Sequence, residues 1–151
     1  MRTAQAGFKS GKGGRTAADL LAELGPTFRV DIGLKSRSAP GAKPNLPLKG
    51  VRALLDTGAG GNCIDDELAR TLGLPIMDEG EVVGINGRTP ANIYMARMYI
   101  PDLDRLLFEP FSGVRLMEGE QWHRVILGRP FLRPYRMIYD ATCGKVELVE
   151  P

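Results

Sequence analysis

Apolar and polar residues alternate along several short stretches of the chain, as they do in β-strands with one buried face. The clearest stretch is Thr27–Ser36, which reads TFRVDIGLKS. Val51–Asp56 (VRALLD) and Arg124–Gly128 (RVILG) are more continuously apolar and also have strand length. Two more short strands are expected at Leu106–Phe108 and Val114–Met117.

Two hairpins are predicted from turn residues that lie between strand-like arms. Residues 81–100 (EVVGINGRTPANIYMARMYI) contain Asn86-Gly87, a pair typical of a type I′ turn. The turn signal alone leaves open whether this is an ordinary surface hairpin or a flap over a binding site. Residues 136–149 (RMIYDATCGKVELV) predict a second hairpin that turns near Thr142–Gly144.

Helical signals are short. Residues 16–25 (TAADLLAELG) begin with the N-cap candidate Thr16 and end at Gly25. A second helix is expected from its N-cap Asp65 to Gly73, and a helical turn in RPFLRPY after Gly128. The sum is a mostly β fold with one or two short helices.

The length of 151 residues favours one folded domain. Residues 1–15 are rich in Gly and Lys and offer little that can pack. We therefore expect a flexible N-terminal segment with a possible short helix at residues 1–26, and the folded domain at residues 27–151.

Charge and composition narrow the classes of partner. The net charge of +2 is spread along the chain, which argues against nucleic acid as a partner. No apolar run approaches a membrane span, so we expect a cytoplasmic protein unless a targeting or membrane segment has been removed. His123 is the only histidine, and with two cysteines it gives no metal-ligand pattern, so neither metal nor cofactor is expected.

The candidate chemistry lies where the apolar strand VRALLD ends in Asp56-Thr57-Gly58. A single carboxylate is a poor catalyst, whereas two facing carboxylates share a proton, so that one is a base and the other an acid. The chain holds one Asp-Thr-Gly and no Asp-Ser-Gly. A second carboxylate must then come from another copy of the chain, which predicts a C2 homodimer with Asp56 of each subunit on the axis.

Three segments in order, ALLDTGA, VVGINGR and VILGRPFL, resemble the retropepsin-like aspartic proteases, the single-domain dimeric relatives of pepsin. The resemblance covers roughly residues 27–150. It implies a closed or partly open β-barrel subunit that forms a C2 homodimer. It also implies an aspartic endopeptidase that binds a peptide or protein substrate as an added strand.

The resemblance also implies a role for each matching position. Asp56 would be the catalytic acid and base, and the flap would close over the substrate. The loop supporting Asp56 and meeting the substrate backbone comprises Thr57, Gly58 and Ala59. The flap comprises Gly84, Ile85, Asn86 and Gly87. The structural support behind the loop comprises Ile126, Leu127, Gly128 and Arg129.

The chain departs from this pattern at two positions. Gly60 stands where retroviral members often have an acidic residue that pairs with the arginine equivalent to Arg129. Asp65 and Asp66 are the residues available to replace that partner. Pro130 stands where Asp or Asn is common, and both changes bear on the support of the dimer rather than on the catalytic carboxylate.

Two other hypotheses compete with the endopeptidase. A non-catalytic dimer of the same fold would use the groove to bind a peptide or a partner strand. A third hypothesis is a β-barrel domain whose Asp-Thr-Gly is accidental.

Overall fold

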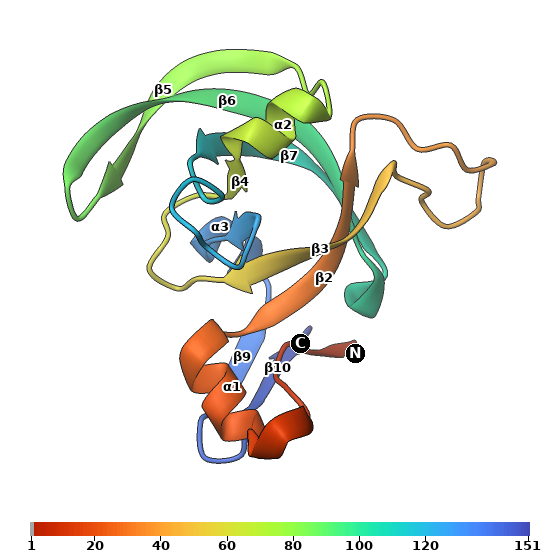
Figure 1. The fold of residues 1–151 in the computed structure, drawn as a ribbon. Helices are drawn as coiled ribbons and strands as arrows, with labels where there is room; N and C mark the ends of the chain where they lie inside the picture. The colour runs from red at the N-terminus through yellow and green to blue at the C-terminus, as the bar shows by residue number, and fades with distance from the viewer. Residues whose placement is uncertain (1) are drawn as a thin grey trace.

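The computed structural model describes residues 2–151, with the backbone alone at Lys12, and most of its strands form one curved sheet. These strands are β2 (Thr27–Gly33), β3 (Leu48–Leu55), β4 (Cys63–Asp65), β5 (Ile76–Gly84), β6 (Gly87–Ile100), β7 (Arg105–Val114) and β8 (Val125–Leu127). Their order is β2-β3-β8-β4-β7-β6-β5, and β6 also pairs with β2. Within the described chain six strands therefore close into a barrel, and the β5–β6 hairpin arches over it (Figure 1).

Alternating side chains fill the barrel, as the sequence pattern predicts. In β2 the residues Phe28, Val30 and Ile32 are buried, and Arg29 between them is exposed. In β3 the buried residues are Val51, Ala53 and Leu55. Because successive side chains point to opposite faces of a strand, every second residue enters the core.

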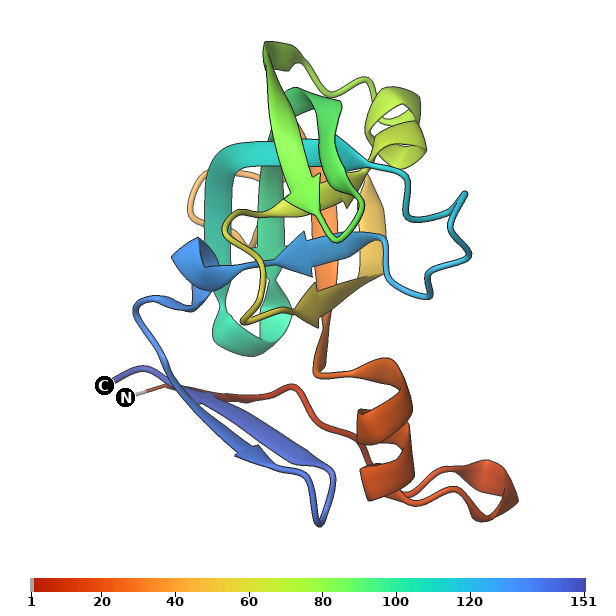
Figure 2. The same cartoon turned by 90° about the vertical axis from the view of Figure 1, so that its left-hand side faces the viewer.

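A second, smaller sheet lies below the barrel (Figure 2). It consists of β1 (Thr3–Gln5), β10 (Lys145–Val149) and β9 (Arg136–Asp140), in that order and antiparallel. Both chain ends lie side by side in this sheet. The predicted hairpin at residues 136–149 is thereby confirmed.

The helices are short and begin where capping residues predict. Thr16 and Asp19 form a reciprocal capping box for α1 (Ala17–Leu24), and Asp65 caps α2 (Asp66–Thr71). Gly25 and Gly73 follow these helices with positive φ. The remaining helical elements are α3 (Arg129–Leu132) and the 3₁₀ turns η1 (Lys12–Gly14) and η2 (Pro101–Leu103).

The hairpin at residues 81–100 forms, but the expected type I′ turn is wrong. Gly84 pairs with Gly87, so Ile85 and Asn86 are the central residues of the turn. A type I′ turn needs positive φ at both central residues, and neither Ile85 nor Asn86 has it; the positive φ, 98°, belongs to Gly87 after them. The glycine therefore serves the strand after the turn, as in a turn followed by a bulge.

Two other expectations differ from the structure. Of the strand expected at Val114–Met117, only Val114 lies in β7, and the following residues form turns. The segment expected to be flexible contains β1, with Ala4 and Ala6 buried against β10. Its first residue, Met1, lies outside the described residues.

Candidate active site

Asp56 directly follows β3 and keeps the alternation of that strand. Its N–H donates to the carbonyl of Leu127 at 2.9 Å, so the ladder between β3 and β8 continues one residue beyond Leu55. Its carboxylate Oδ1 accepts the N–H of Gly58 at 2.8 Å. These bonds fix both the backbone and the carboxylate of Asp56, which is half-buried.

The residues 56–59, called here the Asp56 loop, pack against the segment that follows β8. Arg129 N–H donates to the carbonyl of Ala59 at 2.9 Å. A Cβ added to Gly128 would lie 2.4 Å from the oxygen of Gly61 and 2.7 Å from that of Ala59. Only glycine permits this approach, which explains the apolar-apolar-Gly pattern at residues 126–128.

Asn62 supports the same contact and was missed by the sequence analysis. Its side-chain oxygen accepts the N–H of Gly128 at 2.9 Å, and its amide donates to Glu109 at 3.2 Å. Asn62 is 7% exposed. A polar residue between small residues and the apolar Ile64 was the available signal, because a buried amide needs partners for both its polar atoms.

Arg129 contacts the Asp56 loop through a carbonyl rather than a carboxylate. Its Nη1 donates to the oxygen of Thr57 at 3.0 Å, and no ion pair to it occurs among residues 2–151. A Cβ at Gly60 would lie 3.4 Å from Nη2 of Arg129. Gly60, where the acidic residue is absent, is therefore the position that faces the guanidinium.

The expectation that Asp65 or Asp66 replaces the missing acidic partner is wrong. Asp65 accepts the N–H groups of Leu68 and Met117. Asp66 accepts the hydroxyl of Tyr94 at 2.7 Å and pairs with Arg70. Both carboxylates are therefore committed to α2 and its neighbours.

Cys63 lies close enough to Asp56 for their charges to interact. Burial raises the pKa of the Cys63 thiol, and the charge of Asp56 raises it further. A thiol held neutral in this way is a poor nucleophile. Of these two groups, the carboxylate of Asp56 is therefore the candidate for catalysis.

The residues expected to form the flap do not share a groove with Asp56 within one chain. A groove runs between the β5–β6 hairpin and the end of β7, lined by Ile85 and Thr89 on one side and by Gly113 and Arg115 on the other. Asp56 does not line it. Ile85 at the tip is fully exposed, so the tip of the hairpin does not pack against the rest of the chain.

Two further observations concern the described part of the chain. No group of three or more His, Cys, Asp and Glu side chains there is arranged to hold a metal ion. None of its helices has the length and apolar character needed to span a membrane.

A mostly β barrel that presents Asp-Thr-Gly on a loop packed against Gly128 has the architecture of an aspartic protease. The sequence of this region bears this out, since a family model described as aspartyl protease matches residues 48–131. The chain belongs to the aspartyl protease family, and this makes it a protease by class. The resemblance inferred from the three sequence segments is confirmed.

Among solved structures, the fold is similar to the solution structure of the simian foamy virus (mac) protease. The TM-score is 0.45 at 12% identity, over 71% of this chain and 91% of that chain. No curated protein matches the sequence.

Proposed function

We propose that the chain is an endopeptidase that works as a C2 homodimer, with Asp56 of each subunit forming the catalytic pair. The observation that carries this proposal is the Asp56 loop itself. It holds a half-exposed carboxylate on a backbone tied to β8 and Gly128, in a chain of the aspartyl protease family. The chain has a single Asp-Thr-Gly, so the second carboxylate would come from a second copy.

The chemistry follows from two carboxyl groups that share one proton. The ionised Asp56 takes a proton from a water molecule while the water oxygen bonds to the peptide carbonyl carbon. The protonated Asp56 of the other subunit gives its proton to the carbonyl oxygen. The tetrahedral intermediate then collapses: one of its hydroxyl groups returns a proton to the pair as the carbonyl re-forms, the C–N bond breaks, and the amine leaves with the other proton of the pair. No metal or cofactor takes part.

Other exposed features of the chain fit a second subunit. β9 is an edge strand of the smaller sheet, and its residues Ile138 and Tyr139 are 46% and 49% exposed. Exposed apolar residues on a strand edge favour pairing with another chain. Thr57 and Gly58 are also exposed, free to meet a partner loop and a substrate backbone. The hairpin tip at residues 84–87 would close over the peptide from above.

Cleavage of a peptide library by the Asp56→Asn variant tests this function. Loss of the catalytic carboxylate should lower the rate by about a thousandfold or more, and a statine-type tetrahedral mimic should inhibit the unmodified protein. Asp19→Asn is the matched control, because Asp19 is an exposed carboxylate on α1 that also accepts a backbone N–H, that of Thr16. Cleavage that survives in Asp56→Asn would refute the proposal. Peptide binding without cleavage by the unmodified protein would favour the non-catalytic dimer.

A further inference from the structure

Three arginines lie side by side on adjacent strands, on the outer face of the barrel. Arg29 on β2 is directly opposite Arg52 on β3. Arg124, just before β8, donates its N–H to the carbonyl of Arg52 at 3.0 Å. The chain neighbours Phe28, Val30, Val51, Ala53 and Val125 are buried in the core, and His123 is buried against Thr27. The three guanidinium groups therefore form a transverse row, called here the arginine row.

The arginine row gathers around Trp122. The Cζ of Arg52 lies 4.6 Å from the centroid of the indole ring, and that of Arg29 lies 5.8 Å from it. Arg52 Nε also donates to the carbonyl of Trp122 at 2.5 Å. Arg124 donates to the carbonyls of Gln121 and His123. Each guanidinium has five N–H donors, so most of their donors remain available to a ligand.

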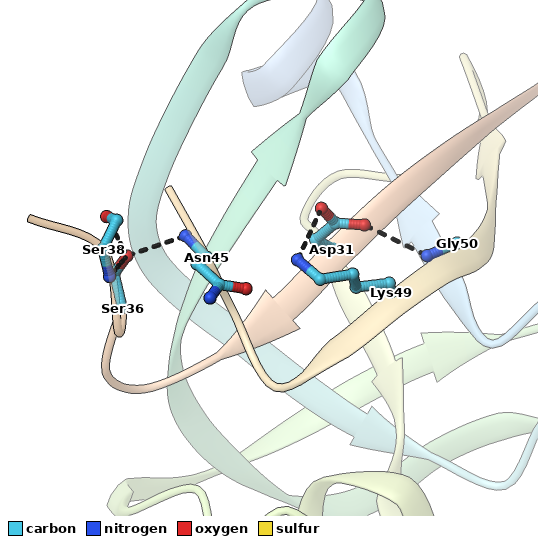
Figure 3. Close-up of polar contacts among 6 residues, drawn as sticks. All are labelled: Asp31, Ser36, Ser38, Asn45, Lys49 and Gly50. Atoms are coloured by element: carbon cyan, nitrogen blue, oxygen red, sulfur yellow. Dashed lines mark hydrogen bonds and ion pairs between the residues drawn. The ribbon is translucent and has the colours of Figure 1, made fainter. Parts of the chain in front are cut away.

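No carboxylate neutralises the arginine row within the described part of the chain. Asp31 lies two residues beyond Arg29 on β2, but its carboxylate is taken by Lys49 at 3.8 Å and by the N–H of Gly50 at 3.1 Å (Figure 3). Like charges opposite one another on adjacent strands repel. Burial, together with the charges of Arg124 and Arg29, lowers the pKa of Arg52. An anion bound here would relieve this repulsion.

A peptide bound at Asp56 reaches the arginine row if it runs along the outer face of β3. Arg52 lies in β3, and Asp56 directly follows that strand, four residues later. Their side chains therefore lie on the same face of the sheet. Four residues of strand span about 13 Å, and an extended peptide covers that distance in about four residues. The row is also local, in a chain whose net charge is only +2, which favours an acidic peptide over the continuous phosphates of nucleic acid.

We propose that Arg29, Arg52 and Arg124 form a specificity site for an acidic side chain of the substrate, about four residues from the scissile bond. The proposal rests on the proposed endopeptidase function. Arg52 is fixed by its stacking on Trp122, and the carboxylate of a substrate Glu or Asp accepts hydrogen bonds from Arg29 and Arg124.

Binding tests the site without any need for cleavage. Trp122 is the only tryptophan, so its fluorescence reports on the arginine row. The probe is a Glu-containing decapeptide titrated into the Asp56→Asn protein, beside the same peptide with Gln for Glu. We expect the Glu peptide to bind about tenfold more tightly, and this preference to vanish in the Arg29→Gln/Arg124→Gln variant. Arg37→Gln, on an exposed arginine of the loop between β2 and β3, should retain it.

Three results would overturn the site. They are equal affinity for the two peptides, a preference that persists in the double variant, and tighter binding of a single-stranded oligonucleotide than of the Glu peptide. Cleavage then tests the register in the unmodified protein, with one Glu moved along a Gln-rich peptide. Faster cleavage with Glu about four residues from the cut supports the site, and rates independent of Glu position contradict it. Failure to cleave any peptide counts against the endopeptidase function, while the binding arm still decides the site.

Discussion

At Asp56 and Gly128 two segments far apart in the sequence meet backbone to backbone. The carboxylate of Asp56 is fixed by Gly58, and the space beside Gly128 is filled by the oxygens of Ala59 and Gly61. Asn62 closes the contact with a buried hydrogen bond to Gly128. These contacts restrict the conformation of the Asp56 loop. The position of the Asp56 carboxylate is therefore set mainly by backbone atoms rather than by mobile side chains.

Gly128→Ala should damage both stability and activity. The added methyl group would overlap two backbone oxygens, and forcing such a contact costs about 1–3 kcal/mol or more. Urea unfolding should show this loss, and peptide cleavage should fall because the Asp56 loop moves. Gly61→Ala is the control, since a Cβ there meets nothing within 4 Å. Equal stability of the two variants would contradict the account.

His123 should make the protein less stable at mildly acid pH. Burial, assisted by the charges of Arg52 and Arg124, lowers the pKa of His123 from 6.5 to about 4. In the unfolded chain the pKa returns to about 6.5, so between these values the unfolded state binds the extra proton. The stability that depends on neutral His123 is therefore fully present above about pH 6.5. It is lost as the pH drops towards 4, which lowers the free energy of unfolding by on the order of 2 kcal/mol.

The free energy of unfolding measured against pH checks this prediction, with His123→Gln as the comparison. Glutamine retains a partner for the hydroxyl of Thr27, which lies 2.8 Å from His123 Nε2, but cannot titrate. The slope between pH 4 and 6.5 should flatten in the variant. An unchanged slope would mean that other groups dominate this range.

At the scale of elements, patterning predicted the strands that fill the core and the hairpins that join them. Phe28, Val30 and Ile32 alternate in the sequence because they alternate in the barrel. The pattern failed where long-range pairing decides the structure. β4 has three residues and exists through its pairing with β7 and β8, and β1 exists through its pairing with β10.

The same limit applied to the site. The Asp56 loop and the glycine after β8 were predicted because both have a local sequence signature. The hydrogen bonds of Asn62 to Glu109, of Asp65 to Met117 and of Asp66 to Tyr94 were not, because these partners lie far away in the chain. The turn at Ile85-Asn86 was misassigned since Asn-Gly fits more than one hairpin geometry.

Ile85→Ser tests the β5–β6 hairpin as a substrate cover. Ile85 is fully exposed in the single chain, so its loss should leave stability within about 0.5 kcal/mol. If the tip closes on a bound peptide, kcat/KM should fall about tenfold. Met77→Ser, an exposed apolar residue at the other end of β5, is the control. A wild-type kcat/KM in Ile85→Ser would assign the hairpin no role in catalysis.

At the scale of the molecule, the N-terminal segment and the C-terminal hairpin form one sheet beneath the barrel (Figure 2). Ala6 donates to Val146, and Thr27 donates in turn to Ala6, so the segment also contacts the start of β2. The division at residues 26 and 27 remains a prediction about folding units. The smaller sheet leaves β9 at its edge, which is where we place the approach of a second chain.

The central claim is that two Asp56 carboxylates from different subunits act as one catalytic group. Unmodified protein and Asp56→Asn, mixed in equal amounts, unfolded together and refolded, test it most directly. If the pair is shared, only dimers of two unmodified chains are active, and activity falls to about one quarter of that of the unmodified protein at the same total concentration. Activity of about one half would show that each subunit works alone and would contradict the shared pair.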